Sequence, residues 1–381
     1  MELKYNGKKT VSEILNTSSK SKFSKPYNNN NSIIYGDNFD ALKILLDTYN
    51  MKGKIDLIYI DPPFATNGIF TIGKDRVSTI SSSKRDEIAY EDNLVGEVFL
   101  EFLRERLLLA KELLSEKGSI YLHIDYKIGH YVKIIMDEIF GQENFRNDIT
   151  RIKCNPKNFS RKAFGNIKDL ILFYSKTNTL IWNEPYTEYT QEDILKLYKK
   201  VDKDGRFYTT VPLHAPGETK DGPTGGEFKG LKPPKGRHWR TDPKELEKLD
   251  EQGLIEWSSN GVPRRKIFAD EQKGKKAQDI WDFKDYQYPV YPTEKNLDLL
   301  KHIIKTSSND DSIILDFFCG SGTTLKAAQE LGRKWIGIDK SEKAISVSIK
   351  KMQPQENDMF VDNSFDYIEV FDSGLSLATN F

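Results

Sequence analysis

Four consecutive residues, Asp61-Pro62-Pro63-Phe64, place a carboxylate, two rigid backbone units and an aromatic ring directly after an apolar run. Each proline fixes its own φ and has no N–H to donate, so a β-strand cannot continue through them. Pro62 also disfavours the helical conformation at Asp61. The tetrapeptide therefore fixes the direction of the Asp61 carboxylate, the Pro62 carbonyl and the Phe64 ring. Such stiffness suits an ordinary strand-ending turn, and it equally suits a site that holds an aromatic base.

A second group of residues surrounds a glycine turn between residues 313 and 342. An apolar strand would end at Asp316, and Gly320 and Gly322 would let the backbone approach a ligand closely. A helix would follow, and a second strand would then end at Asp339, 23 residues after Asp316. An acid at the end of that strand can accept both hydroxyl groups of a ribose.

The same stretch lacks the signals of the two common phosphate-binding turns. Leu325 stands where a dinucleotide fingerprint needs its third glycine, and no Gly-Lys-Thr follows as in a P-loop. A cofactor that carries a ribose but no pyrophosphate fits better, and S-adenosylmethionine is such a molecule. The alternative is a turn that serves packing only, and Asp339 makes that alternative the weaker one.

Alternating strands and helices must position these two groups. Through residues 32–150 the predicted strands are almost continuously apolar, which is typical of a parallel, doubly wound α/β sheet. The alternation breaks at residue 151, where glycines, prolines and short aromatic runs dominate, and it returns near Tyr291. The predicted divisions are an N-terminal extension or linker (1–31), one sheet domain in two parts (32–150 and 289–352), an inserted domain (151–288) and an acidic C-terminal tail (353–381).

Composition indicates an ordinary globular protein of the cytoplasm. No stretch approaches the ~20 apolar residues of a membrane span, and the N-terminus does not read as a signal peptide. The two cysteines and five histidines show neither a disulfide framework nor a metal-binding spacing. Lys plus Arg equal Asp plus Glu at 57 each, but residues 151–290 carry about 27 basic against about 21 acidic residues. That excess hints at nucleic acid, and a solvated surface explains it about as well.

Taken together, the two motifs resemble those of the amino-group DNA methyltransferases. The catalytic motif of that family is Asp/Asn/Ser-Pro-Pro-Tyr/Phe/Trp, and its cofactor motif is Phe-x-Gly-x-Gly; here they are DPPF at 61–64 and FCGSG at 318–322. The catalytic motif comes first and a long insertion separates the two, as in the β group, whose insertion is the target-recognition domain. YGDN, FRNDITRIK, PPKGRHWR and YPTEKN extend the resemblance over about residues 32–350. Asn296 stands where the family usually has proline.

The resemblance implies a Rossmann-like, S-adenosylmethionine-dependent methyltransferase fold with permuted motif order. It implies a site-specific DNA methyltransferase of restriction–modification type that acts on the N6 amine of a flipped adenine. Asp61 and the Pro62 carbonyl would accept the amine hydrogens, and Phe64 would stack on the base. Asp in the first motif position favours adenine, and N4-cytosine methylation is the alternative. A catalytically silent DNA-binding specificity subunit and a small-molecule or RNA methyltransferase are weaker alternatives.

The resemblance also implies residue roles and partners. Asp61, Pro62, Pro63 and Phe64 would be catalytic. S-adenosylmethionine would contact Asp37, Thr293, Lys295, Asp316, Phe318, Gly320, Ser321, Gly322, Thr323 and Asp339. Of these, Asp339 would hold the ribose, Asp37 would reach the adenine moiety, and Thr293 and Lys295 would lie at the methionine end. The expected partners are double-stranded DNA, with a cognate restriction endonuclease and a homodimer as further options, and neither a metal nor a membrane.

The basic and aromatic residues of the insertion are candidates for DNA contact. Arginine can pair with guanine or hold a phosphate, although each of these residues could equally be a solvated surface residue. The candidates are Arg237, His238, Trp239, Arg240, Arg264 and Arg265.

Overall fold

The computed structural model of this chain describes its residues in several stretches. Two of the predicted site residues, Phe64 and Thr293, lie outside them. Between residues 64 and 95 the description is limited to the backbone of β4 (Ile69–Gly73), β5 (Arg76–Ser78) and β6 (Glu87–Glu91), an antiparallel sheet in the order β5-β4-β6. The remaining described stretches are 2–63, 96–156, 162–219, 222–287, 294–353 and 364–372.

The chain divides into two compact units, each described here by itself. The first consists of Met1–Pro185 and Gln278–Phe381, and the second of Tyr186–Ala277. The predicted insertion, 151–288, is therefore wider than the second unit. The reason is that two strands at its ends, β9 (Lys168–Ser175) and β18 (Ile280–Asp282), pair into the sheet of the first unit.

The first unit is built around one large mixed sheet, which confirms the predicted α/β class. Its central strands are parallel neighbours, as predicted. Two strands run against their neighbours: β9 lies antiparallel between β7 and β8, and β1 lies antiparallel to β21. The sheet order is β1 (Ser21–Phe23), β21 (Asp366–Asp372), β2 (Ser32–Tyr35), β20 (Lys334–Asp339), β19 (Ile313–Asp316), β3 (Ile55–Ile60), β7 (Leu114–Ile124), β9, β8 (Phe145–Ile152) and β18.

Two of these strands correct smaller predictions. The predicted linker contains β1, and the predicted acidic tail contains β21, which inserts between β1 and β2 with Ile368 fully buried. Strand pairing between distant segments decides these cases, and local sequence pattern does not report it.

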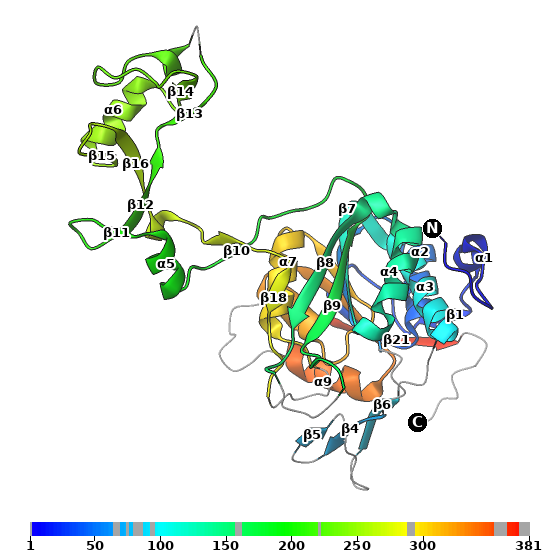
Figure 1. Cartoon of the computed structure of the whole chain (residues 1–381). Coiled ribbons are helices and arrows are strands. Elements are labelled where there is room, and N and C mark those ends of the chain that lie inside the picture. The colour runs from blue at the N-terminus through cyan, green and yellow to red at the C-terminus, as the bar shows by residue number, and fades with distance from the viewer. Residues whose placement is uncertain are drawn as a thin grey trace. The chain divides into compact units, whose positions relative to one another are not determined.

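Helices cover both faces of the sheet, which makes it doubly wound (Figure 1). Each face has its own apolar core, because the strands between them are buried on both sides. One core includes residues of α1 (Val11–Asn16), α2 (Asn38–Asp47), α3 (Gly96–Leu113) and α4 (Tyr126–Phe140). The other includes residues of α7 (Leu297–Ser307), α8 (Thr323–Glu330) and α9 (Glu342–Met352).

The neighbouring strands β3 and β19 form a topological switch point. From β3 the chain passes through α3 on one face to β7, whereas from β19 it passes through α8 on the other face to β20. The two connections therefore leave in opposite directions. In open α/β sheets, ligands bind in the crevice outside the carboxyl ends of the strands at such a point. Asp61 follows β3 and Asp316 ends β19, so the fold brings the two predicted motifs to this edge.

The second unit is a small α/β body with its own core (Figure 1). The core contains Leu213, Phe228, Trp239, Leu246 and Ile255. Strand β13 (His214–Pro216) pairs with β14 (Arg237–Trp239) to form a two-stranded antiparallel ribbon. The other elements are the sheet β11 (Lys200–Val201), β12 (Phe207–Pro212), β16 (Pro263–Phe268) and β15 (Ile255–Trp257), the pair β10 (Tyr186–Thr187) and β17 (Lys275–Lys276), and the helices α5 (Gln191–Leu197) and α6 (Pro243–Glu251).

In the described parts of both units, no helix combines the length and apolar character that crossing a membrane requires.

Candidate active site

Acidic residues follow the carboxyl ends of four neighbouring strands. Asp61 follows β3, Asp316 and Asp339 end β19 and β20, and Asp37 follows β2 after one glycine. The pairing register brings these ends to the same level, since Tyr35 at the end of β2 lies opposite Asp339 at the end of β20. This edge is therefore rich in carboxylates. It suits a ligand that is cationic or carries hydroxyl groups, and it repels a phosphate.

Asp61 forms an ion pair with Lys295, with 2.5 Å between Oδ2 and Nζ. Both side chains are largely buried, with exposed fractions of 16% for Asp61 and 11% for Lys295. The other carboxylate oxygen of Asp61, Oδ1, is buried and has no hydrogen-bond partner in the described structure. A buried acceptor without a partner is costly. Asp61 thus keeps one strong acceptor open for a donor that comes from a ligand.

A buried polar network lies beneath Asp61. Tyr59 precedes Asp61 by two residues on β3, and its hydroxyl lies 2.9 Å from Nδ1 of His123. Nε2 of His123 lies 3.2 Å from Asp169, which also accepts a hydrogen bond from Lys153 at 2.6 Å. Burial is the main reason that the pKa of His123 is lowered. His123 therefore has a structural role. The sequence analysis did not identify Asp169 or Lys153 as members of this network. For Asp169, an acid directly before the apolar run of β9 was the available signal.

Asp316 orders the glycine turn from below. Its carboxylate accepts the Phe318 N–H at 3.0 Å and the Thr324 hydroxyl at 2.6 Å. The side chain is buried, and burial raises the pKa of Asp316 to about 7 against the effect of these two donors. Asp316 therefore supports the turn with both oxygens.

The two glycines of the turn have left-handed backbones but different surroundings. Gly320 has φ +51°, and the nearest atom to a β-carbon there would be the Phe318 carbonyl oxygen, at 4.0 Å. Gly322 has φ +77°, and a β-carbon there would lie 2.7 Å from the Ser348 hydroxyl oxygen. Only Gly320 leaves open space for a ligand. Gly322 is required by the packing of α9.

Asp339 closes the turn from the side. Its carboxylate accepts the backbone N–H groups of Gly320 and Ser341, both at 2.9 Å. Burial raises the pKa of Asp339, although these donors oppose the shift. Each carboxylate oxygen has a second lone pair, so the residue can also accept the hydroxyl groups of a ribose.

Asp37 and Phe318 belong to one cluster of side chains beside the glycine turn, and Arg106 and Phe102 connect them. Asp37 caps α2 by accepting the Phe39 N–H, and its carboxylate lies 3.2 Å from Arg106. Arg106 stacks on Phe102 at 3.6 Å, and Phe102 in turn lies 6.1 Å from Phe318 between ring centroids. The Asp37 side chain remains 44% exposed. Arg106, which the sequence analysis did not single out, therefore holds the Asp37 carboxylate in place.

The hydroxyl groups of Ser321 and Thr323 face a lysine from α9. Nζ of Lys351 lies 3.3 Å from the Ser321 hydroxyl oxygen and 3.2 Å from that of Thr323. It also forms an ion pair of 2.6 Å with Glu294. Sequence spacing gives no signal for Lys351, because it comes from the helix after the second strand of the motif.

The candidate DNA-contacting residues separate into three groups. Arg237, Arg240 and Arg264 surround His214: Arg237 donates to His214 Nδ1 at 3.2 Å, Arg240 to the Pro212 carbonyl at 3.2 Å and Arg264 to the Thr210 carbonyl at 2.8 Å. Burial, followed by the charges of these three arginines, lowers the pKa of His214. In the stretches described for this unit, none of the three arginines forms an ion pair. We call these four residues the His214 cluster.

Trp239 is a correction to the predicted DNA contacts. Its exposed fraction is 3%, its indole N–H donates to the Gly226 carbonyl at 2.9 Å, and its ring packs edge-on against Phe228. Such burial excludes direct contact between this ring and DNA. His238 is partly buried and bonds to the Gly217 carbonyl at 2.8 Å, and Arg265 is exposed.

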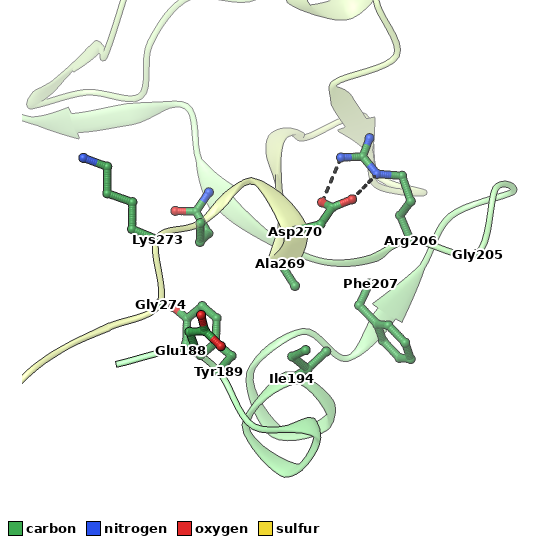
Figure 2. A pocket seen from close by; sticks show the side chains of 11 residues that line it. Glu188, Tyr189, Ile194, Gly205, Arg206, Phe207, Ala269, Asp270, Lys273 and Gly274 are labelled. Carbon is green, nitrogen blue, oxygen red and sulfur yellow. Dashed lines mark hydrogen bonds and ion pairs between the residues drawn. The ribbon is translucent and has the colours of Figure 1, made fainter. Parts of the chain in front are cut away.

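A shallow pocket elsewhere in the second unit shows the opposite arrangement (Figure 2). Arg206 points toward Asp270 and forms two hydrogen bonds of 2.8 Å with its carboxylate, and it also pairs with Glu271 at 2.6 Å. Because this arginine is neutralised by carboxylates, it is a poor phosphate ligand.

The proteins that this chain resembles are DNA methylases and methyltransferases. The family model for DNA methylases matches residues 55–351. The chain is 44% identical over 328 residues to the type II methyltransferase M.EcaI of Enterobacter cloacae, an alignment that covers 84% of this chain and 69% of M.EcaI. It is 30% identical to the type II methyltransferase M.KpnI of Klebsiella pneumoniae, over 80% of this chain and 78% of M.KpnI. The chain belongs to the DNA methylase family.

More distant relatives are longer than this chain. The Mod subunit of the type III restriction–modification enzyme StyLTI of Salmonella typhimurium is 28% identical, and the alignment covers 86% of this chain but 54% of that subunit. The chain thus spans about half the length of this relative. Solved structures are similar at a lower level: an M1.HpyAVI–SAM complex has a TM-score of 0.44 at 18% identity, covering 84% of this chain and 98% of that one. PvuII DNA methyltransferase, which is cytosine-N4-specific, has 0.45 at 14%, covering 86% and 88%.

The residues at the carboxyl edge fit S-adenosylmethionine. Open space lies at Gly320, Asp339 and Asp37 offer carboxylate oxygens to hydroxyl and amino groups, and the acidic edge favours a sulfonium cation. No pyrophosphate has to be accommodated. Sequence reasoning identified these residues, whereas Lys295, predicted at the methionine end of the cofactor, pairs with Asp61 in this structure.

Proposed function

We propose that this chain is a site-specific DNA methyltransferase that methylates the N6 amine of adenine in double-stranded DNA. The observation that carries the proposal is the buried Oδ1 of Asp61, an open acceptor at the switch point of the sheet. An exocyclic amine brings the donor that this acceptor lacks. The stiff Asp-Pro-Pro backbone and the neighbouring glycine turn support the same conclusion.

The chemistry requires hydrogen-bond acceptors rather than a strong base. The lone pair of a nucleobase amine is delocalised into the ring, so the amine is a poor nucleophile. Asp61 Oδ1 accepts one amine hydrogen and the Pro62 carbonyl accepts the other, which localises the lone pair on nitrogen and stabilises the positive charge that develops there. S-adenosylmethionine, when bound, supplies a methyl group on a cationic sulfur. The nitrogen gains that methyl group and loses one proton, for which the Asp61 carboxylate is the acceptor.

The target base must leave the double helix to reach Asp61. Phe64 follows the two prolines, and we assign it the role of stacking on the flipped base. Base–aromatic stacking contributes roughly 1–3 kcal/mol. Phe64→Ala is therefore expected to weaken methylation while Asp61→Ala abolishes it, and a Phe64→Ala enzyme with the wild-type rate would contradict the stacking role.

The choice of adenine rests on the aspartate in the first motif position. N4-cytosine methylation is the alternative, because cytosine presents a similar amine to the same acceptors. The test is to incubate the protein with radiolabelled S-adenosylmethionine and unmethylated bacterial genomic DNA, and to identify the labelled nucleoside after digestion. Label in 6-methyladenine is expected, label in 4-methylcytosine would change the base only, and label in neither would overturn the proposal. Asp61→Asn, which keeps the side-chain size, is the control.

We assign DNA recognition to the second unit, Tyr186–Ala277. The His214 cluster supports this assignment, because three arginines gather on and beside a two-stranded ribbon without ion pairs in the described stretches. Uncompensated arginines bind phosphate and can read guanine, and two-stranded ribbons can enter the major groove. Arg265 and His238 are secondary candidates.

The relatives extend the proposal to partners. The type II and type III names of the matched proteins support a cognate restriction endonuclease that cleaves the same sequence when it is unmethylated. Plasmid DNA methylated by this chain should then resist that endonuclease. We also propose a homodimer, and light scattering of the purified protein would test its mass. A monomer with full activity would remove the dimer from the proposal.

A further inference from the structure

Three consecutive residues, Glu294, Lys295 and Asn296, reach three different parts of the first unit. Asn296 caps α7 by accepting the N–H groups of Asp298 at 2.9 Å and Leu299 at 3.2 Å. It also donates to the carbonyl of Lys284 at 2.9 Å, in the segment that follows β18. The backbone of this tripeptide is therefore fixed at one end by a helix and by the returning chain.

Lys295 reaches the catalytic motif. Its ammonium group lies 2.5 Å from Asp61 Oδ2, in surroundings where water has little access to either group. Charge-assisted contacts of this kind are short and directional. The pair occupies one oxygen of the carboxylate and leaves Oδ1 open. Burial is the main reason that the pKa of His123 is lowered, and the charge of Lys295 lowers it further. Lys295 therefore lies near the buried network that supports β3.

Glu294, the preceding residue, reaches the cofactor turn. Its carboxylate pairs with Lys351 at 2.6 Å, and the same lysine contacts the hydroxyl groups of Ser321 and Thr323. Glu294 and Lys351 are largely buried, with exposed fractions of 11% and 19%. One backbone step thus separates the ion pair at the catalytic carboxylate from the ion pair at the glycine turn.

We infer that Lys295 is a positioning residue for Asp61, and that Glu294 and Lys351 tie it to the cofactor turn. The inference rests on the proposed function, since it gives Asp61 its role. Lys295 holds Oδ2, so that Oδ1 faces the incoming amine in one orientation. Without this cation, the carboxylate would be buried without a partner and would turn away or take up water. Because Glu294 is bonded through Lys351 to the turn, a ligand that orders the turn also orders the catalytic carboxylate.

Three variants test the inference. Lys295→Met removes the charge and keeps the length of the side chain, and Lys295→Arg restores the charge. Lys301→Met is the matched control, because Lys301 lies on the adjoining helix α7 and forms a 2.6 Å pair with Glu330 away from the site. The measurements are kcat for methyl transfer to genomic DNA at saturating substrate, and the Kd for S-adenosylmethionine by calorimetry.

Lys295→Met is expected to lower kcat on the order of 100-fold, which is the cost of misplacing a reacting group by about 1 Å. Its Kd for S-adenosylmethionine should change by less than about threefold, and Lys295→Arg, which keeps a cation beside the Asp61 carboxylate, should recover most of kcat. Lys301→Met should match the wild type. A rise in Kd as large as the loss in kcat would instead place Lys295 on the cofactor, and an unchanged kcat would overturn the inference.

A second measurement separates this inference from the proposed function. The melting temperatures of Lys295→Met, Asp61→Asn and the double variant form a cycle that needs no activity. Each single variant should lower the melting temperature, and the double variant should lose clearly less than the sum. Additive losses would show that the two side chains are not coupled and would overturn the inference. A wild-type chain that methylates no DNA would defeat the proposed function, and the cycle would still decide whether Lys295 holds Asp61.

Discussion

Gly322 lies directly against Ser348 of α9: a β-carbon at position 322 would be 2.7 Å from the Ser348 hydroxyl oxygen, 3.1 Å from its β-carbon and 3.3 Å from its α-carbon. Rotation of the hydroxyl would relieve only the first of these contacts. We therefore expect Gly322→Ala to lower the free energy of unfolding by roughly 2–5 kcal/mol, from left-handed strain and overpacking together. Urea denaturation would measure this loss.

Gly320→Ala is the matched comparison. The backbone there is also left-handed, but the space around it is open, so its stability loss should be about 1–2 kcal/mol. Its larger effect should be on the affinity for S-adenosylmethionine, because the new methyl group would occupy the ligand's side of the turn. If the two variants lost equal stability, the division of roles between these glycines would be wrong.

Asp61→Asn should remove most of the rate without removing the cofactor. Asparagine offers one neutral oxygen and a donor where the amine needs a charged acceptor, and it also loses the ion pair with Lys295. Loss of one preorganised group of this kind typically costs about 10²–10³ in kcat. Initial rates of label transfer, compared with calorimetric binding of S-adenosylmethionine, would check the prediction. A variant that retained more than a tenth of wild-type kcat would show that Asp61 is not the essential acceptor.

Sequence reasoning found the parts of the site that lie on strand ends. Asp61 and Asp316 could be brought together in advance, because apolar strands in parallel order end at one edge of a sheet. The Lys295–Asp61 pair and Lys351 could not be found this way. Their roles depend on side chains that meet from distant segments, and spacing along the chain holds no record of such contacts.

The same limit explains the errors outside the site. Trp239 stands among arginines in the sequence, yet its ring completes a core with Phe228, which is eleven positions away and adjacent only after folding. Strand β9 is a short apolar run inside a region rich in glycine and proline. Its assignment to the sheet follows from pairing with β7 and β8, which the local pattern does not reveal.

Trp239→Ala should therefore act on stability rather than on DNA recognition alone. Loss of a buried tryptophan from a small core typically costs about 3–5 kcal/mol, and the core of the second unit is small. We expect this unit to melt at a lower temperature and to become sensitive to proteolysis between residues 186 and 277. A variant that melted like the wild type and lost only DNA affinity would restore Trp239 as a contact residue.

The His214 cluster should govern the salt dependence of DNA binding. Each phosphate contact contributes about 0.9 to the slope of log K against log salt on duplex DNA. Replacing Arg237, Arg240 and Arg264 together with glutamine should therefore lower that slope by up to about 3. Fluorescence anisotropy with a labelled duplex across a range of sodium chloride concentrations would give the slope.

Arg206→Gln is the control for this experiment. Arg206 belongs to the same unit, but it pairs with Asp270, as Figure 2 shows, and also with Glu271. It should leave the slope unchanged. A reduction of about 0.9 in Arg206→Gln, equal per removed charge to that in the triple variant, would mean that the effect follows total charge, and the His214 cluster would lose its special role.

Asp316 should make stability fall as the pH rises. Burial raises its pKa to about 7 in the folded chain, from an ordinary value of 3.8. Between these two values the folded chain holds a proton that the unfolded chain has released. Folding is therefore favoured at the acidic end of this range, and the advantage is lost as the pH rises through 7. At 1.36 kcal/mol per pH unit, the loss is at most on the order of 4 kcal/mol.

Asp316→Asn isolates this effect, because asparagine can still accept the Phe318 N–H and bond the Thr324 hydroxyl but cannot ionise. The difference in the free energy of unfolding between the variant and the wild type should shift in favour of the variant from pH 5 to pH 8. Urea denaturation at both pH values would measure it, and the other titrating groups cancel because both proteins share them. A difference that stays constant over this range would mean that Asp316 is already ionised at pH 5 in the folded chain, in spite of its burial.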